Sequence, residues 1–363
     1  MNIYIDESGV FKPEVKAQSI SCVAALIVPS VIEPELFAAF ELWKKSPSLQ
    51  NKREKNGEIK GKSLNEREVS SLLHLLSHFD VLVEVVCMDM GMTSDTDIQR
   101  YKDRTNDSLS KSGWALKLNA PFNPKIIGSL SSPLFSQSLG LFELFRRVLD
   151  IAIPYYVQRF PQELASFNWI LDSKDKSLTK YEEIMTSLIK PWLQMLTFEE
   201  PIRMQEYEDF SAFNEFIISK EDLLEPFKSI VIESKGAFNI NKIFKNLNFA
   251  QSYPNTGLEI VDILTNCIQR AINNKLQFEG WRFLSSLIVF RVEQAIKIKG
   301  FISEDASKYA SHTRQFVNYF TVCGKKMTVP DQLRAKAKKG YISWDYLENL
   351  TDKKVKRTSL EYY

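Results

Sequence analysis

The sequence predicts an α/β fold, because short apolar, β-branched segments alternate along the chain with longer segments of helical periodicity. The four clearest strand candidates span residues 2–6, 18–29, 81–88 and 167–172, and the clearest helical patterns span 34–45, 65–79 and 135–160. The 363 residues are 44% hydrophobic and 25% charged, which is typical of a globular chain able to bury a large core.

The first nine residues combine a strand with a carboxylate. Ile3 and Ile5 would face one side of the strand, and Tyr4 and Asp6 would face the other. Asp6 would therefore project where the strand ends, before Gly9 allows a sharp turn. A strand-terminal Asp is commonly only a turn residue, so this stretch becomes informative when it is combined with other acids.

The next part of the chain adds a second strand and a second acid. The segment 18–29 is expected to run antiparallel to the first strand and beside it, with both strands central in the sheet. Glu58-Ile59-Lys60 reads as a short extended segment that holds Glu58 and Lys60 towards a common face. Asn65 followed by Glu68 predicts the start of a helix through a capping box. Residues 90–133 break the pattern and predict an insertion or lid.

Two later stretches also bring an acid to an element boundary. The strand at 167–172 ends in Asp172 and so repeats the arrangement of the opening. Pro254 and Gly257 mark a loop that enters a helix, and Asp262 lies among the apolar residues of that helix. A carboxylate in such a position is costly unless a cation or a hydrogen-bond donor compensates it. Further helical segments are expected at 281–295 and 308–319.

Together, Asp6, Glu58, Asp172 and Asp262 suggest a divalent-metal centre. Phosphodiesters can be hydrolysed with two cations roughly 4 Å apart, and Mg²⁺ and Mn²⁺ prefer several carboxylate oxygens. The four cysteines are far apart, and His74 and His78 lack the Glu of a metalloprotease helix. The expected cofactor is therefore Mg²⁺ or Mn²⁺, and the expected partner is DNA or RNA.

At these residues the sequence resembles the bacterial and phage "domain of unknown function 3800" family, which is considered a branch of the ribonuclease H-like superfamily. The resemblance covers roughly residues 1–275 and lies in four motifs: Tyr4-Ile5-Asp6-Glu7-Ser8-Gly9, Glu58-Ile59-Lys60, Ile170-Leu171-Asp172 and Gly257-Leu258-Glu259-Ile260-Val261-Asp262. It implies a mixed sheet flanked by helices, with an acidic metal-binding centre at Asp6, Glu58, Asp172 and Asp262. The family is expected to carry glutamine where this chain has Glu259, an acid that could alter metal binding or simply face solvent.

The resemblance also leads to a division of the chain. Residues 1–275 would form the ribonuclease H-like domain, with its insertion at about 90–133, and residues 276–363 a mostly helical, basic extension. From Phe301 onward the chain has 12 Lys/Arg and 7 Asp/Glu. These cations could bind phosphates, with aromatic residues accepting bases, or they could belong to a solvated tail. The residues concerned are Arg334, Lys336, Lys338, Lys339, Lys353, Lys354, Lys356, Arg357, Tyr341, Trp344 and Tyr346.

Several alternatives remain open at this point. Asp89, at the end of the strand 81–88, competes with Asp172 for the place of third acid, since the strand beside the first one carries a catalytic acid in many ribonuclease H-like enzymes. The leading hypothesis is a metal-dependent nuclease in which Lys60 orients the scissile phosphate or balances the acids. One alternative is a nucleic-acid-binding or phage-defence (antiviral) interaction protein, with a possible protein partner and little or no turnover. Another is a restriction-endonuclease-type site with Glu58-Ile59-Lys60 as its acid-x-lysine element.

The sequence also bears on where the protein works. It shows neither an apolar stretch long enough to cross a membrane nor the features of a signal peptide. We therefore expect a cytoplasmic protein that does not bind membranes.

Overall fold

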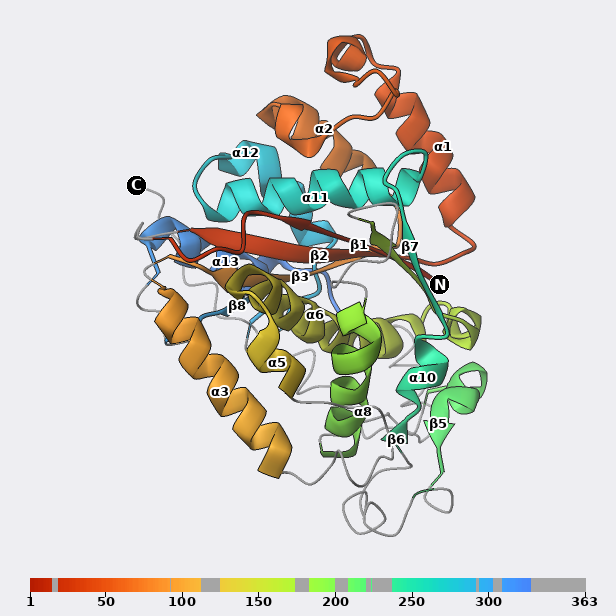
Figure 1. The fold of residues 1–363 in the computed structure, drawn as a ribbon. Coiled ribbons are helices and arrows are strands. Elements are labelled where there is room, and N and C mark those ends of the chain that lie inside the picture. Colours follow the sequence, from red (N-terminus) through yellow and green to blue (C-terminus); the bar gives the residue numbers. More distant parts are fainter. Residues whose placement is uncertain are drawn as a thin grey trace.

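The computed structural model describes residues 1–14, 19–91, 93–111, 125–173, 183–199, 208–219, 223, 237–291, 294–302 and 309–327. A six-stranded mixed sheet forms its centre (Figure 1), in the order β7-β4-β1-β2-β3-β8. Its strands are β1 (Asn2–Ser8), β2 (Ile20–Val28), β3 (Leu82–Asp89), β4 (Asn168–Asp172), β7 (Asn246–Ala250) and β8 (Lys297–Lys299). A separate two-stranded sheet pairs β5 (Ile217–Ile218) with β6 (Ala237–Phe238).

The direction of the strands determines which ends meet. β2 is antiparallel to both β1 and β3, whereas β1 with β4, β4 with β7, and β3 with β8 pair in parallel. The carboxyl ends of β1, β4 and β7 therefore lie at one edge of the sheet. β1 is hydrogen-bonded on both sides, as the sequence predicted, and the strands β1 to β4 lie where the apolar runs placed them.

Helices cover both faces of the sheet (Figure 1). On one side lie α1 (Glu33–Lys44), α2 (Glu66–Leu76), α11 (Thr256–Ile272), α12 (Phe278–Trp281) and α13 (Ser311–Cys323). On the other lie α3 (Asp95–Lys111), α5 (Lys125–Ser129), α6 (Ser132–Tyr156), α8 (Lys190–Glu199) and α10 (Ile240–Ile243). Short 3₁₀ or π turns occur at Pro47–Lys52, Gly61–Ser63, Pro161–Ala165, Met185–Ile189, Ser211–Phe216 and Arg282–Ser286.

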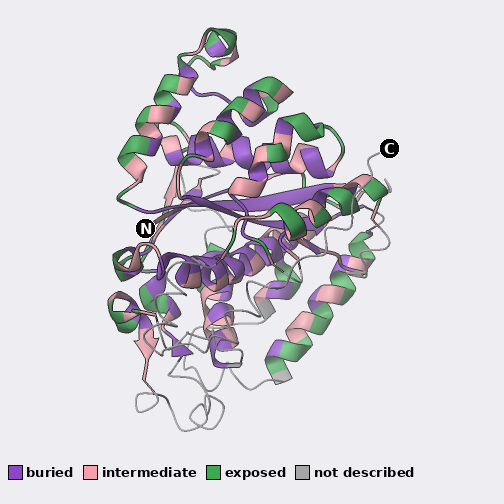
Figure 2. Ribbon diagram, turned by 180° about the vertical axis from the view of Figure 1, so that it is seen from behind, coloured by how far each residue is buried: buried purple, intermediate pink, exposed green. Residues whose placement is uncertain are grey.

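The alternation of side chains along β1 divides the core into two parts. Ile3 and Ile5 pack into the core beneath α6, whereas Tyr4 packs into the core beneath α11. Asp6 has the same parity as Tyr4 and therefore belongs to the α11 side. Figure 2 shows that buried residues are concentrated in the sheet and on the helix surfaces that face it.

The helix boundaries confirm some local expectations and correct others. Asn65 caps α2, accepting from the backbone N–H of Glu68, while the Glu68 carboxylate accepts from the N–H of Asn65. Pro154, an internal proline that favours a break or a kink, does not end α6, which continues to Tyr156. The insertion contains helices α3 and α5 in its described parts.

The chain beyond residue 275 contributes to the central sheet. The helix expected at 281–295 is wrong: after α12 and a 3₁₀ turn, the chain approaches the sheet edge and forms β8 beside β3. α13 packs on α11, where the Thr313 hydroxyl donates to the carbonyl of Ile272 at 3.1 Å. The described residues of this region thus share the core of the preceding part. Residues 328–363, which hold the predicted basic clusters, lie outside the described part of the chain. None of the described helices is both long and apolar enough to cross a bilayer.

Candidate functional site

The parallel pairing of β1 and β4 brings Asp6 and Asp172 together, although β1 does not end at Asp6 as expected but continues to Ser8. Ile5 of β1 pairs with Leu171 of β4 in parallel register, so the next residue on each strand is an aspartate. Asp6 is 7% exposed, and Asp172 is partly buried. The backbone N–H of Ser252, two residues beyond the end of β7, donates to the Asp172 carboxylate. Three parallel strands therefore contribute to one corner of the sheet.

Helix α11 adds Asp262 to this corner. Asn255 caps the helix by accepting from the N–H of Leu258 at 3.1 Å, and Gly257 lies directly on the Tyr4 ring. A Cβ at position 257 would come within 2.4 Å of that ring, so only glycine permits this approach. The close contact brings the Asp262 carboxyl to Asp6, and the two side chains share a hydrogen bond.

The segment carrying Glu58 and Lys60 is held on α11 by two hydrogen bonds, which run from its backbone N–H groups to carboxylates of the helix. The N–H of Ile59 donates to Glu259 Oε1 at 2.7 Å, and the N–H of Gly61 donates to Asp262 Oδ2 at 2.9 Å. A Cβ at position 61 would lie 2.7 Å from Asn266 Cβ, so the helix can be approached closely only by glycine. Alternate residues thus face the helix, which leaves Glu58 and Lys60 on the common side that the sequence predicted.

Glu58 and Lys60 form an ion pair, and Ser252 links them further. The Ser252 hydroxyl donates to Glu58 Oε1 at 2.8 Å, and the Lys60 ammonium donates to the same hydroxyl oxygen at 3.2 Å. The Asn56 amide donates to Glu58 Oε2 at 3.3 Å, and its oxygen accepts from the Glu58 backbone N–H at 3.1 Å. Ser252 and Asn56 were not predicted from the sequence, because neither type of residue is unusual in a loop.

The pKa shifts indicate that the four acids and Lys60 form one electrostatic group. Burial raises the pKa of Asp172, Lys60 lowers it, and Asp262 and Glu58 raise it further, so that it lies above its usual value. Burial likewise raises the pKa of Asp262 against the opposing effects of the Gly61 N–H and Lys60. In Glu58, burial is outweighed by hydrogen bonds from Lys60 and Ser252, and its pKa falls.

Lys60 responds to the same neighbours. Burial lowers its pKa, but the hydrogen bond to Glu58 and the charges of Asp262, Glu58 and Asp172 raise it overall. The ammonium is therefore strongly held as a cation within the group.

Asp89 lies apart from this group. Its carboxylate accepts from the N–H of Gly91 at 3.0 Å, and burial raises its pKa to about 6. In the register of the sheet Asp6 is level with Ala24 and Val85, so Asp89 stands two strands away and four residues further along. These steps correspond to about 10 Å across the sheet and about 13 Å along it. Of the two candidates for the third acid, the structure places Asp172 with the others.

Glu259 neither faces solvent nor joins the acids around Lys60. It is 3% exposed, and its Oε2 pairs with the Lys44 ammonium at 2.7 Å while its Oε1 receives the Ile59 N–H. Burial raises the pKa of Glu259 despite the hydrogen bonds from Lys44 and Ile59. Glu259 therefore holds the segment 58–61 against α11.

The donor set is compatible with a hard divalent cation, although it is arranged around other partners. Within the described residues, no three Asp, Glu, His or Cys side chains are arranged to hold a metal ion as they stand. The Lys60 ammonium is paired with the Glu58 carboxylate, and the Asp6 and Asp262 side chains are bonded to each other. The ammonium places a positive charge at carboxylate oxygens, which are the ligands that Mg²⁺ and Mn²⁺ prefer.

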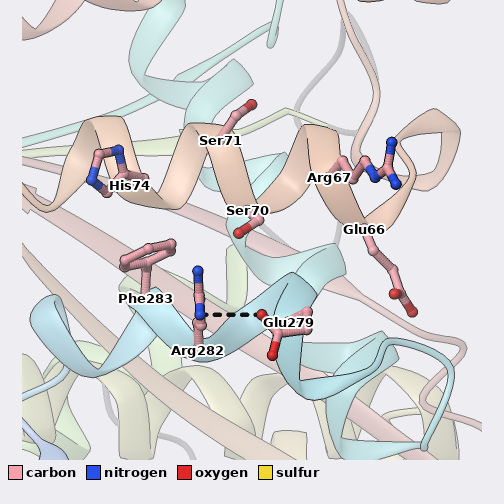
Figure 3. A pocket seen from close by; sticks show the side chains of 8 residues that line it. All are labelled: Glu66, Arg67, Ser70, Ser71, His74, Glu279, Arg282 and Phe283. Carbon is pink, nitrogen blue, oxygen red and sulfur yellow. Dashed lines mark ion pairs between the residues drawn. The ribbon is translucent and has the colours of Figure 1, made fainter.

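A separate surface hollow lies between α2 and the turn after α12 (Figure 3). It measures about 670 Å³, and the His74 and Phe283 rings contact each other in it at a tilt, with ring centroids 4.9 Å apart. Arg282 pairs there with Glu279 at 3.2 Å. None of the predicted site residues lines this hollow, and His74 with His78 makes an edge-to-face ring contact that requires no metal.

No protein-family model, curated protein or solved structure matches this chain.

Proposed function

We propose that this protein is a divalent-metal-dependent nuclease or related phosphoryl-transfer enzyme of the ribonuclease H-like type. The observation that carries the proposal is the meeting of Asp6, Glu58, Asp172 and Asp262 around Lys60, although they come from four distant parts of the chain. Burying several carboxyls together is costly, as the raised pKa values of Asp172 and Asp262 indicate. A purely structural role would not explain why the fold keeps several carboxyls buried together at this free-energy cost.

The topology supports the ribonuclease H-like part of the proposal. That assignment requires the first strand to be central in a mixed sheet with an antiparallel second strand beside it, and β1 and β2 have this arrangement. Asp6, two residues before the end of β1, and Asp172 at the end of β4 then occupy the positions that the resemblance implies. A restriction-endonuclease-type site is less suitable, because Ile59 makes only an isolated bridge with Arg53 outside the six-stranded sheet.

Each residue has a role in this proposal. Asp6, Glu58, Asp172 and Asp262 would hold Mg²⁺ or Mn²⁺, which would supply an activated water and a counter-charge for the leaving oxygen. Lys60 would orient the scissile phosphate with its ammonium, which the structure keeps protonated beside Glu58. Ser252 and the N–H of Gly61 would keep the carboxylates in place.

One observation favours the second candidate, a nucleic-acid-binding or phage-defence interaction protein with little turnover. The Lys60 ammonium already offsets part of the acidic charge, so the group is partly compensated by the chain itself. Such a protein would bind nucleic acid or a protein partner without needing a metal.

The test is a cleavage assay with labelled DNA and RNA, in Mg²⁺, Mn²⁺ or EDTA, on the full chain. We expect cleavage that needs the cation, and a loss of about 100-fold or more in Asp6→Asn and Asp172→Asn. Asp89→Asn is the matched control, because it makes the same change at another strand end and should keep the activity. Cleavage in EDTA, or equal activity in Asp172→Asn, would contradict the proposal, and binding without cleavage would favour the second candidate.

A further inference from the structure

The carboxylate of Glu58 has little room left for a metal. Its Oε1 receives both the Lys60 ammonium and the Ser252 hydroxyl, and its Oε2 receives the Asn56 amide. A carboxylate oxygen offers about two lone-pair sites, so Oε1 is already filled by two donors. Any cation that binds this oxygen must displace one of them.

Lys60 is the donor that can be displaced most easily. Its side chain is 26% exposed, whereas that of Glu58 is 4% exposed, so the ammonium can turn towards water while the carboxylate stays in place. The backbone of the segment need not move, because Ile59 and Gly61 remain bonded to α11. The flexible stem of a lysine allows such a rotation without unfolding.

We propose that Lys60 is a built-in counter-cation that occupies the acid group until a divalent cation displaces it from Glu58. This inference rests on the proposed function, because it concerns metal entry at the same site. Within the group, the ammonium offsets the carboxylate charge of Glu58 through their ion pair. A divalent cation that replaces the ammonium supplies more positive charge to the same oxygens, and the released ammonium becomes free to contact a phosphate.

The inference predicts opposite effects of one substitution on two measurements. Removing the ammonium takes away both a competitor and a repulsive charge, so Mn²⁺ should bind more tightly to Lys60→Met by about 10-fold or more. Cleavage should nevertheless fall, because the phosphate loses its contact. If Lys60 only contacted the phosphate, metal affinity would not change.

The experiment is a calorimetric titration of the full-length protein with MnCl₂, without nucleic acid. Lys62→Met is the matched control, since Lys62 is exposed in the same loop, and it should bind as the wild type does. Lys60→Arg keeps the charge and should also remain near the wild-type affinity. Thermal unfolding without metal checks that each variant is folded, and Lys60→Gln, which also removes the charge and should also bind Mn²⁺ more tightly, tests the inference if Lys60→Met does not fold.

The outcomes separate the two proposals. Tighter binding in Lys60→Met or Lys60→Gln, but not in the two controls, supports displacement. Equal or weaker binding in a folded Lys60→Met or Lys60→Gln, or clearly tighter binding in Lys60→Arg, overturns displacement but leaves the metal centre standing. No Mn²⁺ binding in any variant overturns both the displacement and the proposed metal-dependent function.

Discussion

The backbone N–H of Ile59 donates to the Glu259 carboxylate at 2.7 Å, across 200 residues of sequence. The other oxygen of Glu259 pairs with Lys44, and the side chains of both partners are almost fully buried. This contact holds the residue between Glu58 and Lys60 against α11. It explains how an acid outside the candidate site determines where two of the site residues lie.

The first prediction concerns this buried pair. Glu259→Ala should lower the free energy of unfolding by about 3–5 kcal/mol, because it leaves the buried Lys44 ammonium without its buried carboxylate partner. Adding Lys44→Met should restore part of that loss, since no buried charge then remains. Urea unfolding of the single and double variants measures the coupling. Glu41→Gln is the control: Glu41 also pairs with Lys44 but is largely exposed, so its loss should cost less than about 1 kcal/mol. Additive effects of the two substitutions would contradict the coupling.

The second prediction concerns the contact between α11 and β1. In Gly257→Ala the new methyl group would overlap the Tyr4 ring. That ring is held in place, because the Tyr4 hydroxyl donates to Glu33 and the ring packs near Phe37. The helix must then shift, at a cost of about 1–3 kcal/mol, and Mn²⁺ affinity should fall as Asp262 moves from Asp6. Thermal unfolding and calorimetry measure the two effects. Gly128→Ala is the matched control on α5, where an added Cβ meets nothing within 4 Å. Equal stability of the two variants would argue against the close contact.

The third prediction concerns Asp89 and pH. Its pKa is about 6 in the folded protein and 3.8 ordinarily, so the folded state favours the protonated acid. Stability from this group is therefore present at low pH and is lost as the pH rises from 3.8 to about 6. Asp89→Asn removes that loss and should be more stable than the wild type by about 1–2 kcal/mol near pH 8, allowing for partial exposure.

The same comparison near about pH 4 should show a much smaller gain, because the wild-type carboxyl is then still protonated in the folded state and only partly ionised in the unfolded state. Urea unfolding of the two proteins at both pH values makes the measurement. A gain independent of pH would mean that the Asp89 carboxylate is not responsible.

The local patterns predicted the central strands because these strands are long, apolar and β-branched. β2 is buried along its whole length, and its pattern has no competing helical period. β7 and β8 were missed for physical reasons. β7 contains two exposed asparagines and no buried residue, and β8 has only three residues, so neither carries a hydrophobic signal of its own. Pairing with a neighbouring strand stabilises both.

The candidate site was predictable where an acid follows an apolar strand or interrupts an apolar helix face, as with Asp6, Asp172 and Asp262. It was not predictable where a partner comes from a distant loop. Nothing in the sequence near Glu259 indicates Lys44 as its partner, and nothing near Ser252 indicates that its hydroxyl lies between Glu58 and Lys60. Such contacts depend on tertiary packing, which local periodicity does not describe.

The late position of α11 in the chain has a consequence for protein synthesis. A ribosome-bound chain that stops before Thr256 already contains Asp6, Glu58 and Asp172, but it lacks the helix that binds the backbone of Ile59 and Gly61. Contacts between such distant segments form late in folding. Under the proposed function, an incomplete translation product could not assemble the acidic group, so reactivity towards nucleic acid would begin only when most of the chain has been made.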